Sequence, residues 1–326
     1  MLITAFGGGV LAAAIGAVPA FVMTGLTVLA AVFGGEFGSA IVNTISFGSF
    51  FGPHVAFAGA VAAAAYAKGR GLLEDGMDII TPLIKLKDPM TLLIGGAFGV
   101  IGFMIQYVLG TVIGATLIGN AGWTDTVALT VVLSAIIARL LFTKSGLTGV
   151  QPDGKKRSLF PDGKRLSLLV VVGLGIGIVG GGFTTSLGEL AQAGQFATDL
   201  SVISGATTAD TALLLFNNAG TIGFGLAAVV LIFACMGKPV EAFHHIILPA
   251  CTTAMIVFKG TYNGILSILA AAVMGILAAV LGEFLGNTFN SYADSHIDPP
   301  AFTICILQLI NFSLLAQCIA PTGIFA

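Results

Sequence analysis

The sequence predicts an all-α polytopic membrane protein with two homologous halves of about four spans each, containing discontinuous helices and short re-entrant segments. Three observations predict this class: 56% of the 326 residues are hydrophobic, only 9% are charged, and the mean hydropathy is +1.03. A soluble domain carries about a quarter charged residues. A transmembrane β-barrel would instead show short segments of alternating hydropathy.

Long apolar segments give the expected membrane crossings, since about 20 apolar residues span a bilayer as a helix. Residues 1–33 form the first span, because they lack a basic n-region and are too long for a cleaved signal peptide. Further spans are expected at 91–119, 126–143, 166–187, 210–236, 262–286 and 301–320. The apolar pieces 79–86 and 246–258 look too short to cross, so we interpret them as re-entrant or interfacial.

One markedly polar stretch, from Lys144 to Arg165, divides the chain nearly in half. It separates a first membrane repeat (1–145) from a second (166–326), with a cytoplasmic linker at 146–165. Short motifs recur in the same order in both halves: Asp78–Pro82 aligns with His245–Pro249, and Asp125–Thr130 aligns with Asp298–Thr303. The shared order and nearly constant offset predict an internal duplication.

The distribution of basic residues predicts the topology. The loops 34–39, 120–125, 188–209 and 287–298 contain no Lys or Arg, whereas the linker is rich in them. Basic loops stay in the cytoplasm, so we expect a multi-pass protein of the inner (plasma) membrane with both termini cytoplasmic. Four spans per half would make the repeats parallel. An inverted repeat is the alternative if the two short pieces cross the membrane.

Polar residues and small residues interrupt one apolar segment in each half, which predicts two broken helices that meet at a solute site. Free half-helix ends could bind an ion or a polar group there, together with polar side chains. The predicted substrate-binding residues are Asn217, Asn218 and Thr221 in the second half and Asn43, Ser46, Ser49 and His54 in the first. The alternative is that these residues only pack helix against helix.

A second set of polar residues predicts an ion pathway. Asp125 and Asp298 each open the last span of a half, where a carboxylate also caps the helix. Thr130 and Thr303 lie five residues further on and could continue a polar track, and Glu283 lies near the expected outer end of a long apolar helix. Capping alone is the alternative for the two aspartates.

We predict no functional role for several other polar residues. Arg139 is expected to reach the cytoplasmic surface by snorkelling, and His244 and His245 are expected at the membrane interface. The four cysteines lack metal-type spacing, so we predict no metal and no cofactor. No catalytic cluster falls within a span, so we predict that the protein is not an enzyme.

These features favour a transporter or channel that moves a small polar solute or small ion between the two repeats. The expected partners are the lipid bilayer, the solute or ion, and further copies of the chain associating through glycine-rich faces, but no nucleic acid. The alternative is a membrane subunit of an ion-pumping or redox complex. Ser204-Gly205-Ala206-Thr207 resembles the sequence at which membrane subunits of sodium-pumping and Rnf-type complexes carry covalent flavin phosphate, which would make Thr207 the attachment point.

Overall fold

The protein is all-helical. The computed structural model describes residues 1–32, 34–120, 122–193 and 208–325, of which none lies in a β-strand, and the protein is 74% helix. Four helices are long and apolar enough to cross a membrane, at Pro89–Ile118, Gly163–Gln192, Gly264–Phe289 and Pro299–Cys318. These apolar helices indicate a membrane-embedded protein.

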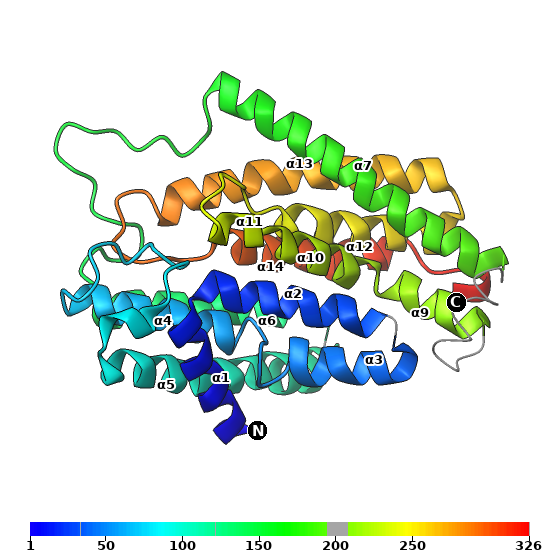
Figure 1. Ribbon diagram of the computed structural model, residues 1–326. Coiled ribbons are helices and arrows are strands. Elements are labelled where there is room, and N and C mark those ends of the chain that lie inside the picture. The colour runs from blue at the N-terminus through cyan, green and yellow to red at the C-terminus, as the bar shows by residue number, and fades with distance from the viewer. Residues whose placement is uncertain (33, 121, 194–207, 326) are drawn as a thin grey trace.

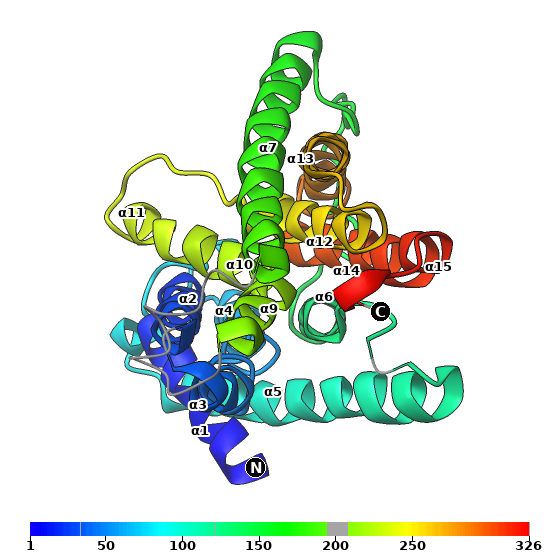
Figure 2. The ribbon, with the colours of Figure 1, turned by 90° about the vertical axis from the view of Figure 1, so that its right-hand side faces the viewer.

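The helices of the two halves lie on either side of a shared centre (Figures 1 and 2). The first half contains α1 (Leu2–Ile15), α2 (Ala17–Val32), α3 (Gly35–Ile41), η1 (Val42–Ser46), α4 (Ala56–Gly69), η2 (Leu83–Leu86), α5 (Pro89–Tyr107), η3 (Val108–Ile118) and α6 (Thr126–Phe142). The second contains α7 (Gly163–Ala193), α9 (Thr208–Asn217), α10 (Ala219–Val230), α11 (Ile232–Cys235), α12 (His244–Thr261), α13 (Gly264–Phe289), α14 (Pro299–Ile310), η4 (Asn311–Leu315), α15 (Ala316–Cys318) and η5 (Gly323–Phe325). The largest apolar core joins α2, α4 and α6 to α10, α12 and α14.

Glycine lets two pairs of helices pack at backbone distance. Between α1 and α5, a Cβ on Gly9 would lie 2.1 Å from the carbonyl oxygen of Gly95. Between α7 and α13, a Cβ on Gly173 would lie 2.5 Å from the carbonyl oxygen of Gly275. Neither crossing leaves room for a side chain. Small residues are therefore required at both, as is common where helices associate in lipid.

The first predicted span is bent. α1 and α2 meet at an angle of 119°, because Gly16 between them has φ +99°. A side chain is strained in that conformation, and a Cβ there would also meet the carbonyl oxygen of Ile80 at 2.3 Å. The first predicted span, residues 1–33, therefore consists of two apolar helices joined at a sharp bend.

The two predicted helix breaks differ in kind. In the first half, residues 47–55 are irregular between η1 and α4, and the Thr24 hydroxyl donates to the carbonyl of Phe51 at 2.6 Å. In the second half, only Asn218 separates α9 from α10. Its N–H donates to Leu214 at 3.1 Å and its carbonyl accepts from Ile222 at 2.9 Å. The backbone of Asn218 itself is therefore paired on both sides, and the two helices are separated by a single residue.

One predicted re-entrant piece is a full helix. The segment 246–258 belongs to α12, which runs for 18 residues with Pro249 inside it. Most of its side chains are buried, including both histidines of its first turn. The sequence estimate was too short because His244, His245 and Lys259 interrupt the apolar run, although burial inside the protein keeps them away from lipid.

Arg139, in the last turn of α6, is fully buried. Its guanidinium donates to the Ser295 hydroxyl at 3.1 Å, the Asn290 side chain at 3.1 Å and the Leu147 carbonyl at 2.9 Å. It also donates to the carbonyls of Phe289 and Ser295. Arg139 therefore does not snorkel as expected but ties the α13–α14 loop to α6.

The loop between α13 and α14 lies beside the linker. Its predicted position, on the membrane side opposite to the linker, is therefore wrong. The Lys144 N–H donates to the Asp294 carboxylate at 3.1 Å, and Val150 donates to the Tyr292 carbonyl at 3.0 Å. The end of α6 meets the loop just before α14, at Ser295. The start of α6 lies further along α14, where the Thr124 hydroxyl donates to the carbonyl of Cys305 at 2.6 Å. The two helices therefore run antiparallel. A parallel relation between these two helices, the expected one, is thereby contradicted.

The C-terminal segment packs at the end of the bundle far from the linker (Figure 1). The Thr322 N–H donates to the carbonyl of Lys259, in the last turn of α12, at 3.0 Å. The Phe325 ring lies 5.0 Å from that of Phe216. The linker and the C-terminus were expected on one membrane side, but they occupy opposite ends because α12 is a full helix.

We expect Gly9→Leu to lower the stability of the detergent-solubilised protein by about 3 kcal/mol, since overpacking forces α1 and α5 apart. Gly7→Leu is the matched control on the same helix, because no atom lies within 4 Å of a Cβ at Gly7. The measurement is the thermal unfolding midpoint. Equal midpoints for the two variants would contradict the close packing of α1 on α5.

We expect Arg139→Lys to destabilise the protein by about 3 kcal/mol, because an ammonium cannot reproduce the planar fork and several buried carbonyls lose their donor. Arg70→Lys, at an exposed position, is the control and should leave the midpoint unchanged. Limited proteolysis should also cut the loop 290–298 sooner in the Arg139 variant. A wild-type midpoint and cleavage rate would rule out this anchoring role.

Asp294 makes the junction between loop and linker sensitive to acid. Burial raises the pKa of its carboxyl, but hydrogen bonds from Ser145 and the Lys144 N–H outweigh burial and leave the pKa below its ordinary value. A group with a lowered folded-state pKa stabilises the fold at neutral pH and loses that contribution as pH falls through the folded value.

We therefore expect Asp294→Asn to lower the thermal midpoint at neutral pH, and the deficit to shrink as the pH falls below about 5 and through the lowered pKa of Asp294. Asp153→Asn, at an exposed linker position, serves as the control. A deficit that stays constant over this range would show that the charge of Asp294 does not contribute.

Candidate functional site

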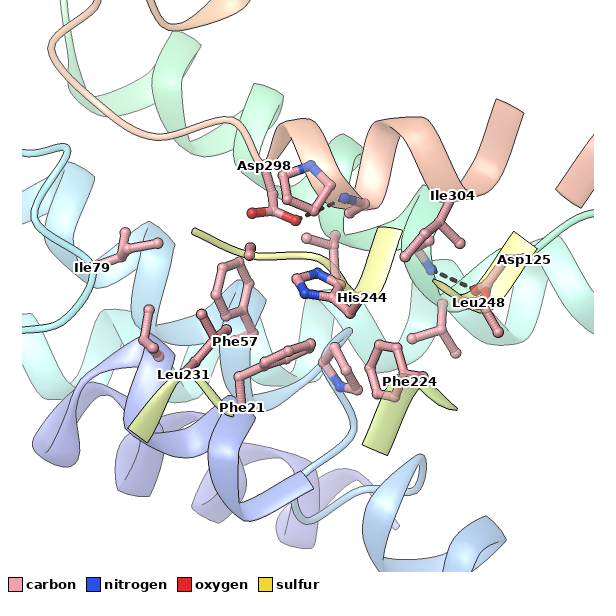
Figure 3. Close-up of a pocket in the computed structure, with 18 of the residues that line it drawn as sticks. Phe21, Phe57, Ile79, Asp125, Phe224, Leu231, His244, Leu248, Asp298 and Ile304 are labelled. Atoms are coloured by element: carbon pink, nitrogen blue, oxygen red, sulfur yellow. Dashed lines mark hydrogen bonds between the residues drawn. The ribbon is translucent and has the colours of Figure 1, made fainter. Parts of the chain in front are cut away.

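A cavity of about 370 Å³ lies at the shared centre of the two halves, and we call it the central cavity. Helices α2, α4 and α6 of the first half and α10, α11, α12 and α14 of the second contribute to its lining. Figure 3 shows many of the lining side chains. The volume is within the range of small-molecule sites, which also favour interfaces between structural units. The cavity is therefore the leading candidate for a binding site.

The carboxylates of Asp125 and Asp298 both cap a helix and line the central cavity. One oxygen of Asp125 accepts from the Ala128 N–H at 2.8 Å, and one of Asp298 accepts from the Ala301 N–H at 2.8 Å. Capping uses one oxygen of each carboxylate. Capping and a role in a pathway are thus compatible, because each residue also faces the cavity.

A histidine accompanies the second of these carboxylates. Nε2 of His296 lies 3.1 Å from the other oxygen of Asp298, and both side chains line the cavity. The backbone between them is held by Asn290, whose side chain accepts from the Ile297 N–H at 3.0 Å and donates to the Ile297 carbonyl at 2.9 Å. Because Arg139 also binds Asn290, the α6–loop contact fixes the position of this pair.

Aromatic rings form one wall of the central cavity (Figure 3). The Phe21 ring centroid lies 5.2 Å from that of Phe224 and 5.9 Å from that of Phe57, both edge to face. Phe47 lies 5.5 Å from Phe224, and His244 lies 4.7 Å from Phe21. The wall joins α2 and α4 to α10 and α12.

His244 has an unsatisfied polar atom at this wall. Its side chain is 6% exposed, and its Nδ1 has no hydrogen-bond partner among the described residues. Buried polar atoms are normally paired. This atom has almost no accessible surface, so it is enclosed by the protein, and the interfacial position expected for His244 is wrong.

A second cavity, of about 260 Å³, lies where the two helix breaks approach each other, and we call it the break cavity. Asn43 lines it from η1, and Asn218 and Thr221 line it from the second break. Thr221 also lines the central cavity. The two cavities therefore adjoin at the Thr221 side chain.

The other four predicted binding residues lie elsewhere. Asn217 is exposed and lines neither cavity. The Ser46 hydroxyl donates to that of Thr27 at 2.8 Å, and Ser49 and His54 are buried behind the break. Neither ring nitrogen of His54 has a partner among the described residues. The structure thus groups three of the seven residues and separates four from them.

The predicted polar track beyond the aspartates is absent. The Thr130 hydroxyl donates to the carbonyl of Thr126 at 2.7 Å, and that of Thr303 donates to the carbonyl of Pro299 at 2.9 Å. Both bonds lie within one helix, and neither threonine lines the central cavity. Asp125 and Asp298 are the members of this set that face the cavity.

Glu283 lies at the linker end of α13 and not at the outer end predicted for it. Arg165, at the start of α7, pairs with Glu283 and with Glu241, each at 2.9 Å. The three residues line a third cavity of about 530 Å³ together with apolar side chains of α7, α12 and α13. An ion pair holding helix ends together explains Glu283 without a place in the pathway.

A buried amide cluster fastens α12 to α14 beside the central cavity. The Gln308 amide donates to Thr252 at 3.0 Å, and the Asn311 amide donates to Gln308 at 2.8 Å and to the Pro249 carbonyl at 3.1 Å. Thr253 donates to the Asn311 oxygen at 2.8 Å. Because these groups satisfy one another, the cluster is a packing element.

Sequence reasoning missed the aromatic wall, together with His244 and His296. The phenylalanines come from separate helices, so no local motif joins them. A weak signal was available for His296, since it stands two residues before an aspartate that caps a helix. The flavin-like motif at 204–207 lies outside the described residues.

The lining of the central cavity restricts what it can bind. It contains two carboxylates and two histidines, but no lysine or arginine. Within the described part of the chain, no group of three or more His, Cys, Asp or Glu side chains is placed to hold a metal ion. The charge favours a cation or a neutral polar molecule over an anion.

Comparisons with known proteins identify a family without assigning an activity. No curated protein and no solved structure matches the chain. One family model matches residues 1–155 and 192–325, which together form most of both halves. The chain therefore belongs to the family of unknown function DUF7973.

Proposed function

We propose that this protein is a membrane transporter or channel that moves a small polar solute or small ion through the central cavity. The observation that carries the proposal is the position of Thr221, whose side chain lines both the central cavity and the break cavity. Two adjoining cavities with polar groups among their lining residues offer a route through an apolar helical protein. If these residues only packed helix against helix, the cavities would be filled by side chains.

A duplicated architecture supports the proposal, and we infer that the halves are inverted repeats. α5 and α13 both begin after a residue with positive φ, Lys87 (54°) and Tyr262 (52°). The next residue caps the helix in each case, Asp88 through the Thr91 N–H and Asn263 through the Leu266 N–H. The corresponding helices α6 and α14 run antiparallel, as an inverted relation requires.

The central pair α2 and α10 supports the same relation. Gly25 of α2 packs against Ala228, and Val28 packs against Gly225 of α10, so positions rise along one helix as they fall along the other. Inverted-repeat transporters place their substrate site at the repeat interface. The central cavity has such a position, since helices of both halves contribute to its lining.

The charge distribution supports a cytoplasmic linker. Lys155, Lys156, Arg157 and Arg165 lie in or next to it, and positive residues favour that side. We propose that the protein spans the inner membrane several times, with the linker in the cytoplasm. The C-terminus, at the opposite end of the bundle, would then face outward.

We expect Thr221→Phe to abolish flux in proteoliposomes, because the larger ring fills the junction between the two cavities. Leu226→Phe is the matched control: it adds a ring to the same helix at a side chain that is 48% exposed. The assay follows uptake of a solute panel with and without a sodium or proton gradient, which separates a coupled transporter from a passive pathway.

Uptake of every solute at the rate of empty liposomes would contradict the proposal. Uptake that is unchanged in Thr221→Phe would show that the route does not pass between these cavities. Thermal midpoints of both variants establish that the added ring has not unfolded the protein.

A further inference from the structure

Asp125 presents a carboxylate to the central cavity without a cationic partner. One of its oxygens accepts the capping bond from Ala128. Among the described residues, no Lys, Arg or His forms an ion pair with it. By contrast, Asp298 across the cavity has His296 beside it. A partly buried carboxylate without a counter-ion favours a cation in the cavity.

The remaining wall fits a large, weakly hydrated cation. The ring planes of Phe21 and Phe224 make an angle of 78°, and those of Phe21 and Phe57 make an angle of 65°. Rings set at such angles can present π-faces to a bound cation from more than one side. Sodium or another hard metal ion instead needs about six oxygen ligands, and the lining is mainly apolar.

The free nitrogen of His244 adds one directional contact. Nδ1 is enclosed by the protein, whereas Nε2 of this cavity-lining residue is not enclosed and forms no hydrogen bond with a described residue. Nε2 could accept a hydrogen bond from a hydroxyl or an ammonium N–H of a ligand, or donate one in the other tautomer. The cavity thus combines an anion, aromatic faces and one hydrogen-bonding atom.

We propose that the central cavity binds a small organic cation, an alkylammonium or quaternary ammonium compound, with Asp125 as its counter-ion and Phe21, Phe57 and Phe224 as its aromatic wall. This inference deepens the proposed transport function, and it rests on that function for the view that the bound cation crosses the membrane. The cavity volume of about 370 Å³ leaves room for such a molecule with some water.

Equilibrium binding to the detergent-solubilised full chain tests the inference without requiring transport. Choline and its uncharged isostere 3,3-dimethylbutan-1-ol have nearly the same shape, so their comparison isolates the positive charge. We expect choline to bind at least about tenfold more tightly than the isostere. Tetramethylammonium and ethanolammonium complete the panel.

Asp125→Asn should remove this preference, because asparagine still caps the helix but carries no charge. The choline affinity should fall about tenfold, to that of the isostere. Asp88→Asn is the matched control, since Asp88 caps α5 with the same 2.8 Å bond outside the cavity lining. Phe21→Leu should weaken choline binding and leave the charge of the cavity unchanged.

Equal affinity for choline and its isostere in the unchanged protein would overturn the inference, whether or not any variant folds. So would the absence of saturable binding by all three cations. Binding without uptake into proteoliposomes would count against the transport proposal alone. Uptake of another solute, without cation binding, would count against the organic cation alone.

Discussion

The geometry of the central cavity depends on one buried guanidinium. Arg139 has no exposed surface, and its donors are taken up by carbonyl and side-chain oxygens of the α13–α14 loop and the linker. Such a group is tolerated in an apolar protein only when its donors are satisfied. By fixing that loop to the end of α6, it sets α14 antiparallel to α6. That direction places the caps of the two helices, Asp125 and Asp298, at opposite ends of the pair, and both line the central cavity.

Small residues let the rest of the bundle close around this space. The glycine crossings of α1 with α5 and of α7 with α13 hold the outer helices at backbone distance. α4 is buried along nearly its whole length, and most of its buried residues are alanines such as Ala58, Ala62 and Ala65. Close backbone packing leaves little room for large side chains between these helices. Several large rings, among them Phe21, Phe57 and Phe224, instead meet at the cavity wall.

Local features of the sequence predicted local structure well. Hydropathy located α6, α13 and the continuous helical segments Pro89–Ile118 and Pro299–Cys318 within a few residues, but it ended α7 too early. The aspartates at positions 125 and 298 are helix caps, as their neighbours suggested. What was missed depends on distant contacts. The bend at Gly16 depends on a close approach to Ile80, and the length of α12 depends on burial of its histidines. The direction of α14 depends on Arg139, whose partners lie about 150 positions away.

The helix breaks also depend on contacts that the sequence does not show. They change which groups of the protein are expected to bind a ligand. Unpaired half-helix ends were the expected ligands, but the backbone at Asn218 is paired on both sides and Thr24 satisfies a carbonyl of the first break. The side chains that line the cavity are therefore the first groups to consider for ligand recognition. The available ones, two carboxylates, Thr221, His244 and the aromatic wall, come from both halves and from six helices. Any movement of one half against the other therefore changes the distances among them, so occupancy of the cavity and the relative position of the halves are energetically linked.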